Sequence, residues 1–461
     1  MLLVELKQIS QLSGFLSKLN GWVALCENNI KRFEKNGRFW PNEKRGDEMS
    51  FMTKSVFNDK VVTAYFPLSY FILGFVGALT MDATLYYLYV SGGTPLEGGL
   101  LIALAYLPWA IKPINAYIQD WYWKYYKWVF VSIGLVAIVV GALSLMFDWG
   151  GLSLSTLVIM VALCSLGRVS TDVAIDGWAV HLTRDDGGGK LRTWMEAAGF
   201  LGGIFGFPLV ILILGDDPVT RWPLVLGISA LFVVILGLVP LVIFRERFRM
   251  YQEEKGYTQV DWPYLWQWIK AAKWLFVFGF VSSLTFAVGK VLGLPWLLSL
   301  GYGPTQIAIF LIGNFVFAAW GAYIAGNVDG NYPPGFAVLL LAVAYLFLGL
   351  FGYLNVWTVP PILFPLIALT GLADGFFIGV IGVFFTKAAH ASGPNGPATK
   401  FAILIASTNL SAAIFAILTG LVFTAYSDYI SYKVIWMAAG ALPAILLVPV
   451  AIKMRVSELD D

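Results

Sequence analysis

The sequence is poor in charge. Only 13% of its 461 residues are Asp, Glu, Lys or Arg, while 59% are hydrophobic. A soluble domain carries about 25% charged residues, so this composition argues against a soluble chain. Many apolar runs reach about 20 residues, the length that crosses a bilayer core of about 30 Å. Because these runs are much longer than the alternating segments of a membrane β-barrel, the sequence predicts an all-α polytopic membrane protein.

Residue types that build catalytic and metal sites are also scarce. The two cysteines, Cys26 and Cys164, and the two histidines, His181 and His390, lie far apart in the sequence. This spacing predicts neither a disulfide framework nor a metal site. No phosphate-binding G-x-x-x-x-G-K-[ST] loop occurs, so a primary pump would need a separate nucleotide-binding partner. The net charge of +2 indicates no nucleic-acid partner. We therefore expect no enzyme and no cofactor.

What the sequence does contain is a succession of apolar segments. With the N-terminus in the cytoplasm, Lys and Arg gather in the inner loops, and the outer loops hold only Arg221 and Lys433. This bias predicts a multi-pass protein with both termini in the cytoplasm, in the inner membrane if the host is prokaryotic. Twelve segments are predicted to span the membrane, near 61–90, 97–119, 127–147, 152–183, 190–214, 221–244, 271–299, 304–327, 335–354, 358–387, 398–425 and 430–452.

The predicted spans divide into two halves. We expect a cytoplasmic tail over 1–60, a six-helix half over 61–244, a linker over 245–270, a second six-helix half over 271–452 and a tail over 453–461. The linker is basic and then aromatic, which favours a helix lying at the membrane interface. GFVGALT at 74–80 and GFVSSLT at 279–285 repeat near the start of each half. Two such halves around a midplane site are the architecture of major facilitator transporters, and we expect a monomer.

Eight ionisable side chains fall inside predicted spans, away from the span ends. Each costs about 2.5–3.5 kcal/mol at the centre of a membrane helix, so such residues face the bundle interior, pair, or line a wet cavity. We interpret them as a substrate and proton pathway, and the alternative is that they form ion pairs that only fix helix packing. The eight are Asp82, Lys112, Arg168, Asp172, Asp176, Glu196, Lys290 and Asp374.

Acids outnumber bases in this set by five to three. If every base pairs with an acid, two carboxylates remain. Burial disfavours the charged form of a carboxyl group, so an unpaired one can bind and release a proton near neutral pH. The tally therefore predicts proton-coupled transport, with Asp82, Asp172 or Asp176 among the proton carriers.

The fourth predicted span arranges its charges on one face. Arg168, Asp172 and Asp176 follow one another at intervals of four residues, which places them within about 40° around a helix. The spacing predicts that Arg168 can pair directly with Asp172 along this face, and whether Asp172 or Asp176 is its structural partner stays open. Which of the two aspartates binds the proton stays open.

The two lysines of this set, and one aspartate beyond it, have more specific interpretations. Lys112 and Lys290 are candidates for holding an anionic substrate, although a lysine near a helix end can instead extend to the interface. Pro113 follows Lys112 and is expected to break the second span. Asp120, at the cytoplasmic end of that span, is predicted to be a gating contact.

Three segments carry a resemblance to a known group. STDVAIDGWAVHL in the fourth span resembles the equivalent segment of the acetyl-coenzyme A transporter and AmpG-type muropeptide permease group of the major facilitator superfamily. AYLPWAIKPINAYIQDWY in the second span and PATKFAILIASTNL in the eleventh are similar to the same group. The matching positions are Asp172, Val173, Ala174, Asp176, Gly177 and Trp178, then Lys112, Pro113 and Asp120, then Ala398, Thr399, Phe401, Ala402 and Ile403.

The run DVAIDG also resembles the folate–biopterin transporter family, and Trp178 favours the first group. Either resemblance implies proton-linked or exchange transport of a fairly large polar or anionic organic solute. We therefore expect a proton symporter that works by alternating access on a muropeptide-like or acyl-CoA-like solute, with a folate- or biopterin-type solute as the alternative. A non-transporting membrane receptor or scaffold is the alternative from another class, but it has little use for eight charges inside the membrane.

Overall fold

The computed structural model describes residues 60–122, 125–146, 154–182, 189–215, 218–248, 262–327, 334–391, 397–427 and 430–457. Every regular element in these ranges is a helix. The predicted tail before residue 60, most of the predicted linker and the last four residues lie outside the described ranges. Residues 50–461 form one compact unit.

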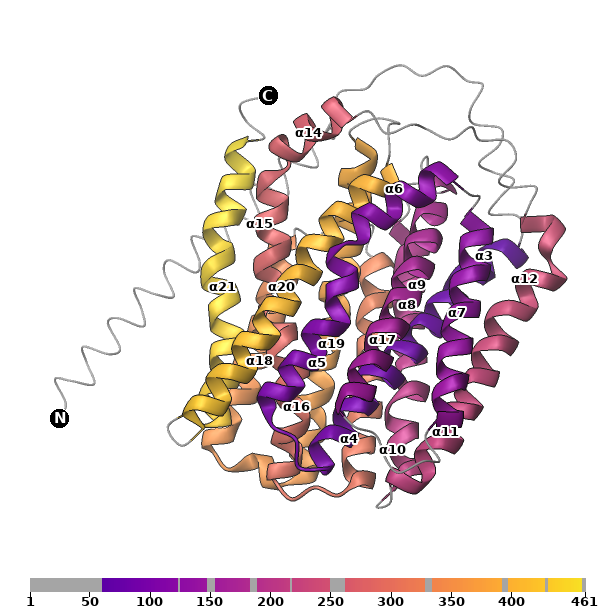
Figure 1. Ribbon diagram of the computed structural model, residues 1–461. Helices are drawn as coiled ribbons and strands as arrows, with labels where there is room; N and C mark the ends of the chain where they lie inside the picture. The colour runs from indigo at the N-terminus through magenta and orange to yellow at the C-terminus, as the bar shows by residue number, and fades with distance from the viewer. Residues whose placement is uncertain are drawn as a thin grey trace. The chain divides into compact units, whose positions relative to one another are not determined.

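Each of the twelve predicted spans coincides with one helix or a broken helix (Figure 1). The first six are α3, η2 and α4 (Lys60–Gly77, Ala78–Ala83, Thr84–Val90), α5 and α6 (Pro95–Ala110, Lys112–Tyr122), α7 (Tyr125–Met146), α8 (Leu154–Leu182), α9 and α10 (Gly189–Gly206, Pro208–Leu214), and α11, η4 and α12 (Pro218–Val233, Val234–Leu238, Val239–Ile243). The last six are α15 and α16 (Lys273–Ser282, Leu284–Ser299), α17 (Pro304–Asn327), α18 (Pro334–Tyr353), α19 (Pro360–Ala391), α20 (Pro397–Tyr426) and α21 (Tyr432–Ser457).

Among the described residues, ten of these spans are long and apolar enough to cross a membrane. The other two predicted spans are α8 and α21, which are helices of 29 and 26 residues. The all-helical fold class is therefore confirmed, and ten of the twelve predicted crossings meet the criterion of length and composition. Between the halves lies α14 (Trp262–Ala271), the aromatic helix expected in the linker.

Proline accounts for two of the breaks in the spans. The second span stops at Ile111 and restarts as α6 with Pro113 in its first turn, as the sequence predicts, because proline lacks the amide that would continue the bonding. The fifth span breaks at Phe207, just before Pro208. The first span contains no proline at its irregular segment: η2 is a turn of π-helix, and it carries Asp82. Single π-turns occur frequently at functional sites.

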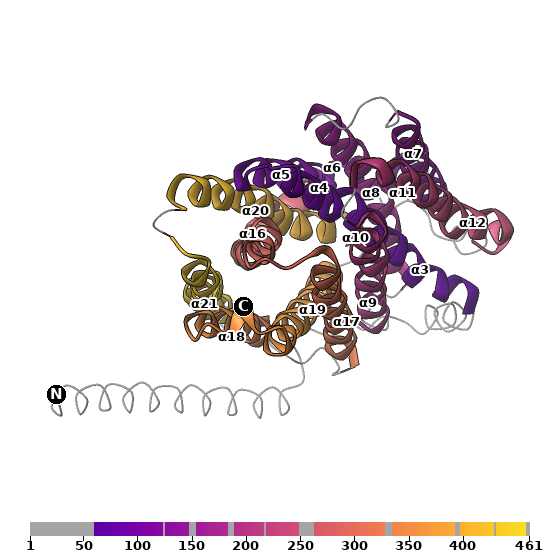
Figure 2. The ribbon, with the colours of Figure 1, turned by 90° about the horizontal axis from the view of Figure 1, so that it is seen from below.

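The helix contacts of the first half recur in the second half, between the spans that come six positions later in the chain. In the first half α3 packs on α9, α5 and α6 pack on α8, and α7 packs on α11. In the second half α15 and α16 pack on α20, α17 on α19, and α18 on α21. The halves meet at two contacts, where α5 lies beside α20 and α9 beside α17 (Figure 2). These two contacts are equivalent, because each pairs the second span of one half with the fifth span of the other. An internal repeat accounts for this pattern.

Glycines set the closest approaches, and they follow the same repeat. A Cβ added at Gly74 would lie 1.9 Å from the carbonyl oxygen of Gly199, across α3 and α9. At Gly279, the matching position of the sequence repeat, it would lie 2.5 Å from the Ser407 hydroxyl on α20. Gly199 with Gly203 and Gly202 with Gly206 form two GxxxG pairs on α9, which therefore serve close helix packing, as small residues do in membrane interfaces.

Candidate functional site

Lys112 lies at the centre of a buried ionic cluster. Its ammonium group pairs with Asp172 and, at 2.6 Å, with Asp176 on the facing helix α8. The three residues are 1%, 4% and 2% exposed. Because the two carboxylates stand one turn apart on α8, a single ammonium group reaches both. The break after Ile111 starts α6 at Lys112 and so positions this side chain.

A second cation completes the cluster. Arg192 on α9 pairs with Asp176, and at 2.5 Å with Glu196 one turn further along its own helix. The Tyr70 hydroxyl also donates a hydrogen bond to Asp176. The sequence interpretation missed Arg192 because this residue, at the edge of the predicted span 190–214, was counted among the basic residues of a cytoplasmic loop. Its spacing of four residues from Glu196 was the available signal, since that spacing forms helical ion pairs.

Arg168 does not pair with Asp172, so that prediction was wrong. Asp172 pairs with Lys112 instead. The Arg168 side chain points toward α3, where its Nε donates a hydrogen bond to the Leu73 carbonyl at 3.2 Å. Its guanidinium carbon lies 5.3 Å from the centre of the Trp109 ring. Within the described ranges no ion pair is found for Arg168. Three charges on one helix face were predicted correctly, but their partners come from other helices.

The remaining three predicted charges form two further contacts, of which one joins the halves. Lys290 on α16 contacts both carboxylate oxygens of Asp82, at 2.9 and 2.8 Å. Asp82 is 5% exposed and the Lys290 side chain 23%. Asp374 on α19 is half-buried and accepts a hydrogen bond from the Tyr345 hydroxyl at 3.1 Å. Among the described residues Asp374 has no ion-pair partner.

Seven of the eight predicted pathway residues therefore form ion pairs or hydrogen bonds with one another or with Arg192, Tyr70 and Tyr345. The exception is Arg168, which donates to a backbone carbonyl. With Arg192 added, the described spans hold at least four bases against the five acids. Asp120 lies in α6, but its side chain is outside the described residues. No group of three or more His, Cys, Asp or Glu in the described ranges could hold a metal ion.

Aromatic rings separate the cations. Phe401 on α20 lies 5.6 Å from the Lys112 ammonium and 4.9 Å from the Arg192 guanidinium, measured to its ring centre. Trp109 lies between Lys112, at 5.7 Å, and Arg168. Cation–π attraction of this kind is stronger where water is excluded. Phe401 thus brings the second half of the chain onto the ionic cluster of the first.

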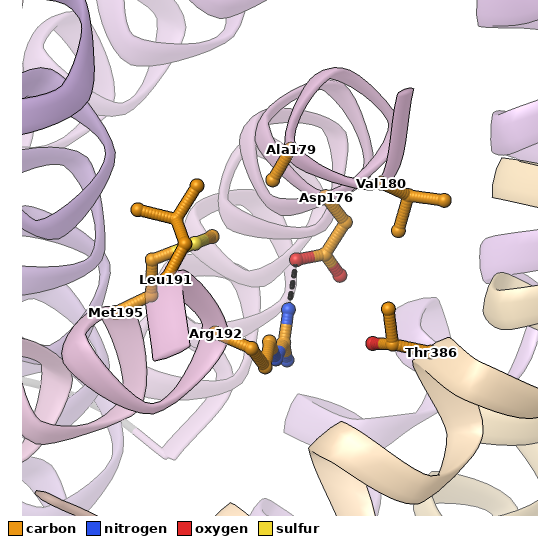
Figure 3. A pocket seen from close by; sticks show the side chains of 7 residues that line it. All are labelled: Asp176, Ala179, Val180, Leu191, Arg192, Met195 and Thr386. Carbon is orange, nitrogen blue, oxygen red and sulfur yellow. Dashed lines mark hydrogen bonds and ion pairs between the residues drawn. The ribbon is translucent and has the colours of Figure 1, made fainter. Parts of the chain in front are cut away.

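A recess adjoins the cluster between α8, α9 and α19 (Figure 3). Asp176 and Arg192 face each other across it, and Thr386 approaches from α19. Its free space is that of about one water molecule, far below the roughly 300–1,000 Å³ of most ligand pockets. The helices at this end are thus closed around the cluster in the conformation seen here.

Solved transporters share this fold. FucP, a major facilitator superfamily transporter in its outward conformation, aligns with a TM-score of 0.56 at 13% identity, over 86% of this chain and 98% of its own. A variant of the E. coli fucose:proton symporter FucP gives 0.59 at 14% identity, over 86% and 98%. A variant of the nucleoside transporter NupG gives 0.56 at 15% identity, over 86% and 99%. At these identities the likeness shows the fold alone, which is that of the major facilitator superfamily.

No curated protein matches the chain. One family model does match, and it covers residues 74–439, most of both predicted halves. The family and the structural neighbours are membrane transporters and not enzymes, in agreement with the sequence prediction. The finer resemblance to the acetyl-coenzyme A and AmpG-type group is not confirmed by this match. By the extent of the match, the chain belongs to the BT1 family.

Proposed function

We propose that the chain is a proton-coupled secondary transporter that moves an anionic organic solute by alternating access between two six-helix halves. The observation that carries the proposal is the ion pair between Asp82 and Lys290, which joins the first span to the seventh. When two halves rock about a central site, a contact of this kind must break and re-form in each cycle.

The energetics favour a working role for these charges. A buried ion pair is often no more stable than apolar residues of the same volume, because desolvation offsets the attraction. Packing alone therefore gives little reason to keep Lys112, Arg192 and Lys290 in membrane helices. Ionisable residues there typically mark substrate or proton pathways.

The solute is proposed to be an acid. Arg168 has no ion-pair partner in the described ranges, and the Lys290 side chain is more exposed than that of its partner Asp82. Either cation can hold a carboxylate or phosphate group. Muropeptide-like and acyl-CoA-like solutes, which the fourth-span resemblance implies, carry such groups.

A folate- or biopterin-type solute is the second candidate. Aromatic side chains surround the two cations: Trp109 lies beside Arg168, while Phe286 and Phe315 lie 5.6 and 5.9 Å from the Lys290 ammonium, measured to their ring centres. Tyr106 in turn stacks edge-on against Phe286. Flat heterocycles stack on such faces, which favours a solute that combines a planar ring with an acidic group.

The remaining expectations belong to the same proposal. The protein is taken to work as a monomer with both termini in the cytoplasm, and Asp120 to act as a gating contact at the cytoplasmic end. The repeated helix contacts support the two halves. Asp374, the carboxyl group of this set without an ion-pair partner in the described ranges, supports a proton as the coupling ion. The carboxyl groups available are Asp82, Asp172, Asp176, Glu196 and Asp374.

Uptake by purified protein in proteoliposomes tests the proposal. We expect accumulation of one radiolabelled solute from a panel of muropeptides, acyl-CoA, folates and pterins when the outside is acidic, and loss of accumulation when a protonophore collapses the gradient. Asp176→Asn should reduce uptake strongly, with Asp176→Glu as the matched control. Binding of a solute without movement would favour a receptor, and uptake unaffected by the protonophore would remove proton coupling.

A further inference from the structure

Asp374 is a carboxyl group whose charge is not balanced. It lies on α19, inside the membrane-spanning part, with the Tyr345 hydroxyl as its hydrogen-bond donor. Nearby Lys290 interacts with it electrostatically, but its ammonium group contacts both oxygens of Asp82. A carboxylate without a cationic partner is costly in a membrane. In this conformation the neutral, protonated form of Asp374 therefore fits its surroundings best.

Asp374 and Lys290 belong to neighbouring surfaces of the second half. The Tyr345 hydroxyl that binds Asp374 also lies against α16: a Cβ added at Gly289, the residue before Lys290, would be 3.1 Å from this oxygen. Tyr345 thus bridges Asp374 to the turn of α16 that carries Lys290. Four rotatable side-chain bonds allow the ammonium group to reach more than one position along this surface.

Asp82 belongs to the other half, and its contacts show what separates when the halves move. The residue after Lys290, Val291, accepts a hydrogen bond at 2.9 Å from the Tyr89 hydroxyl on α4. Nearer the end of the bundle, the Leu96 amide donates to the Thr424 hydroxyl at 3.2 Å. These contacts hold the halves together at the end where α4 lies, the lower end in Figure 1.

We propose that Lys290 exchanges partners between Asp82 and Asp374, and that this exchange couples a proton to the opening of the α4 end. With this end closed, Lys290 pairs with Asp82, and Asp374 holds a proton. When the halves part, Asp82 moves away with the first half. Lys290 then pairs with Asp374, which releases its proton to water. The inference rests on the proposed function, because it assumes that the halves alternate.

The other titratable groups near α19 lie on α9, α16, α17, α18 and α20. Arg192 and Glu196 on α9 lie beside Gly382, eight residues or about 12 Å along α19 from Asp374. Tyr345 is contributed by α18 and Lys290 by α16. On α17, the neutral Asn314 contacts α19, since its amide donates to the Ile367 carbonyl at 3.0 Å. The titratable Tyr323 lies nine residues further along α17. Lys400 lies on α20, over the Tyr264 ring of α14.

Disulfide cross-linking at the α4 end tests the exchange without a solute. The reporter is the full-length chain with Leu96→Cys and Thr424→Cys, in a background with Cys26→Ser and Cys164→Ala. The Leu96 amide nitrogen lies 3.2 Å from the Thr424 hydroxyl oxygen in the closed state, so bond lengths limit the Cα–Cα distance to about 7 Å, the upper range for a disulfide. Thiol oxidation itself accelerates with pH, so each variant is compared with the reporter alone at the same pH.

Asp374→Asn, a mimic of the protonated form, should keep the end closed. Its cross-linking rate relative to the reporter should rise with pH, by up to about tenfold per unit, the limit for one proton. Asp374→Glu should keep this ratio near one. Asp82→Asn should cross-link several-fold more slowly at every pH, because Lys290 then has only Asp374 as a partner. Folding is checked by gel filtration and thermal unfolding in detergent.

If the cross-linking rate of Asp374→Asn relative to the reporter does not change with pH, the role of the proton is overturned. If Asp82→Asn cross-links as fast as the reporter, the exchange of partners is overturned. If Asp374→Asn does not fold, Tyr345→Phe serves instead: it removes the hydroxyl that holds Asp374 and should displace the pH dependence of cross-linking, and an unmoved dependence refutes the proposal. Cross-linking that behaves as expected in a protein without uptake activity would reject the proposed function and leave the exchange intact.

Discussion

Replacing Lys112 with methionine removes the cation that two carboxylates share, but it should leave only one of them without a partner. Asp176 keeps Arg192 and the Tyr70 hydroxyl, whereas Lys112 is the one ion-pair partner found for Asp172 in the described ranges. The cost of Lys112→Met is therefore that of a single orphaned buried charge. Removal of one partner from a buried pair typically costs about 3–5 kcal/mol.

The structure also predicts which second substitution repairs the damage. Asp172→Asn in the Lys112→Met background removes the orphaned charge and should restore most of the lost stability. Asp176→Asn in the same background leaves Asp172 charged and unpaired, and it also takes a carboxylate away from Arg192. That double variant should be no more stable than Lys112→Met alone.

The free energy of unfolding can be measured by far-ultraviolet circular dichroism in mixed micelles of dodecyl maltoside and increasing sodium dodecyl sulfate. The matched control is Asp172→Asn alone, in which Lys112 keeps Asp176 at 2.6 Å. If Asp176→Asn rescues Lys112→Met as well as Asp172→Asn does, the assignment of partners within the cluster is refuted.

Three further outcomes follow from single contacts. Gly202→Ala should cost about 1–3 kcal/mol of stability, because its Cβ would lie 1.9 Å from the Phe71 carbonyl oxygen, whereas Gly134→Ala, with no atom within 4 Å, should be neutral or stabilising by up to about 1 kcal/mol in the same micelle assay. Arg168→Gln should raise the KM for an acidic solute about tenfold or more with little change in stability, which an unchanged KM in proteoliposome uptake would contradict. Lys400→Gln should speed limited proteolysis around α14 several-fold, since the ammonium group lies 4.9 and 5.8 Å from the centres of two aromatic rings on that helix.

Local pattern was enough to place the charges of the fourth span. The interval of four residues puts Arg168, Asp172 and Asp176 on one face of any α-helix, whatever surrounds it. The same argument failed for their partners, because it considered only α8. Lys112 lies 60 residues from Asp172 in the sequence, and its ammonium group reaches that carboxylate only because α6 packs against α8.

Arg192 shows the limit of span boundaries drawn from hydropathy. A residue at the edge of an apolar run is assigned to a loop by default, since the window average falls where charges cluster. The structure instead places Arg192 in α9 and buries it against Asp176, so it belongs to the pathway. Asp82 and Lys290 were both identified, but their contact spans 208 residues and could not be read from either segment.

The sequence by itself determined the class of fold, the order of the apolar segments, and most of the charges that the membrane makes costly. These follow from composition and helical period, which are properties of single segments. Only the tertiary structure decided which charges meet, because ion pairs such as Asp82–Lys290 form between segments brought together by packing. The assignment of Asp172 to Lys112 and the lone position of Asp374 have the same origin. Partners across helices depend on three-dimensional approach, and a residue's neighbours in the chain carry no information about that.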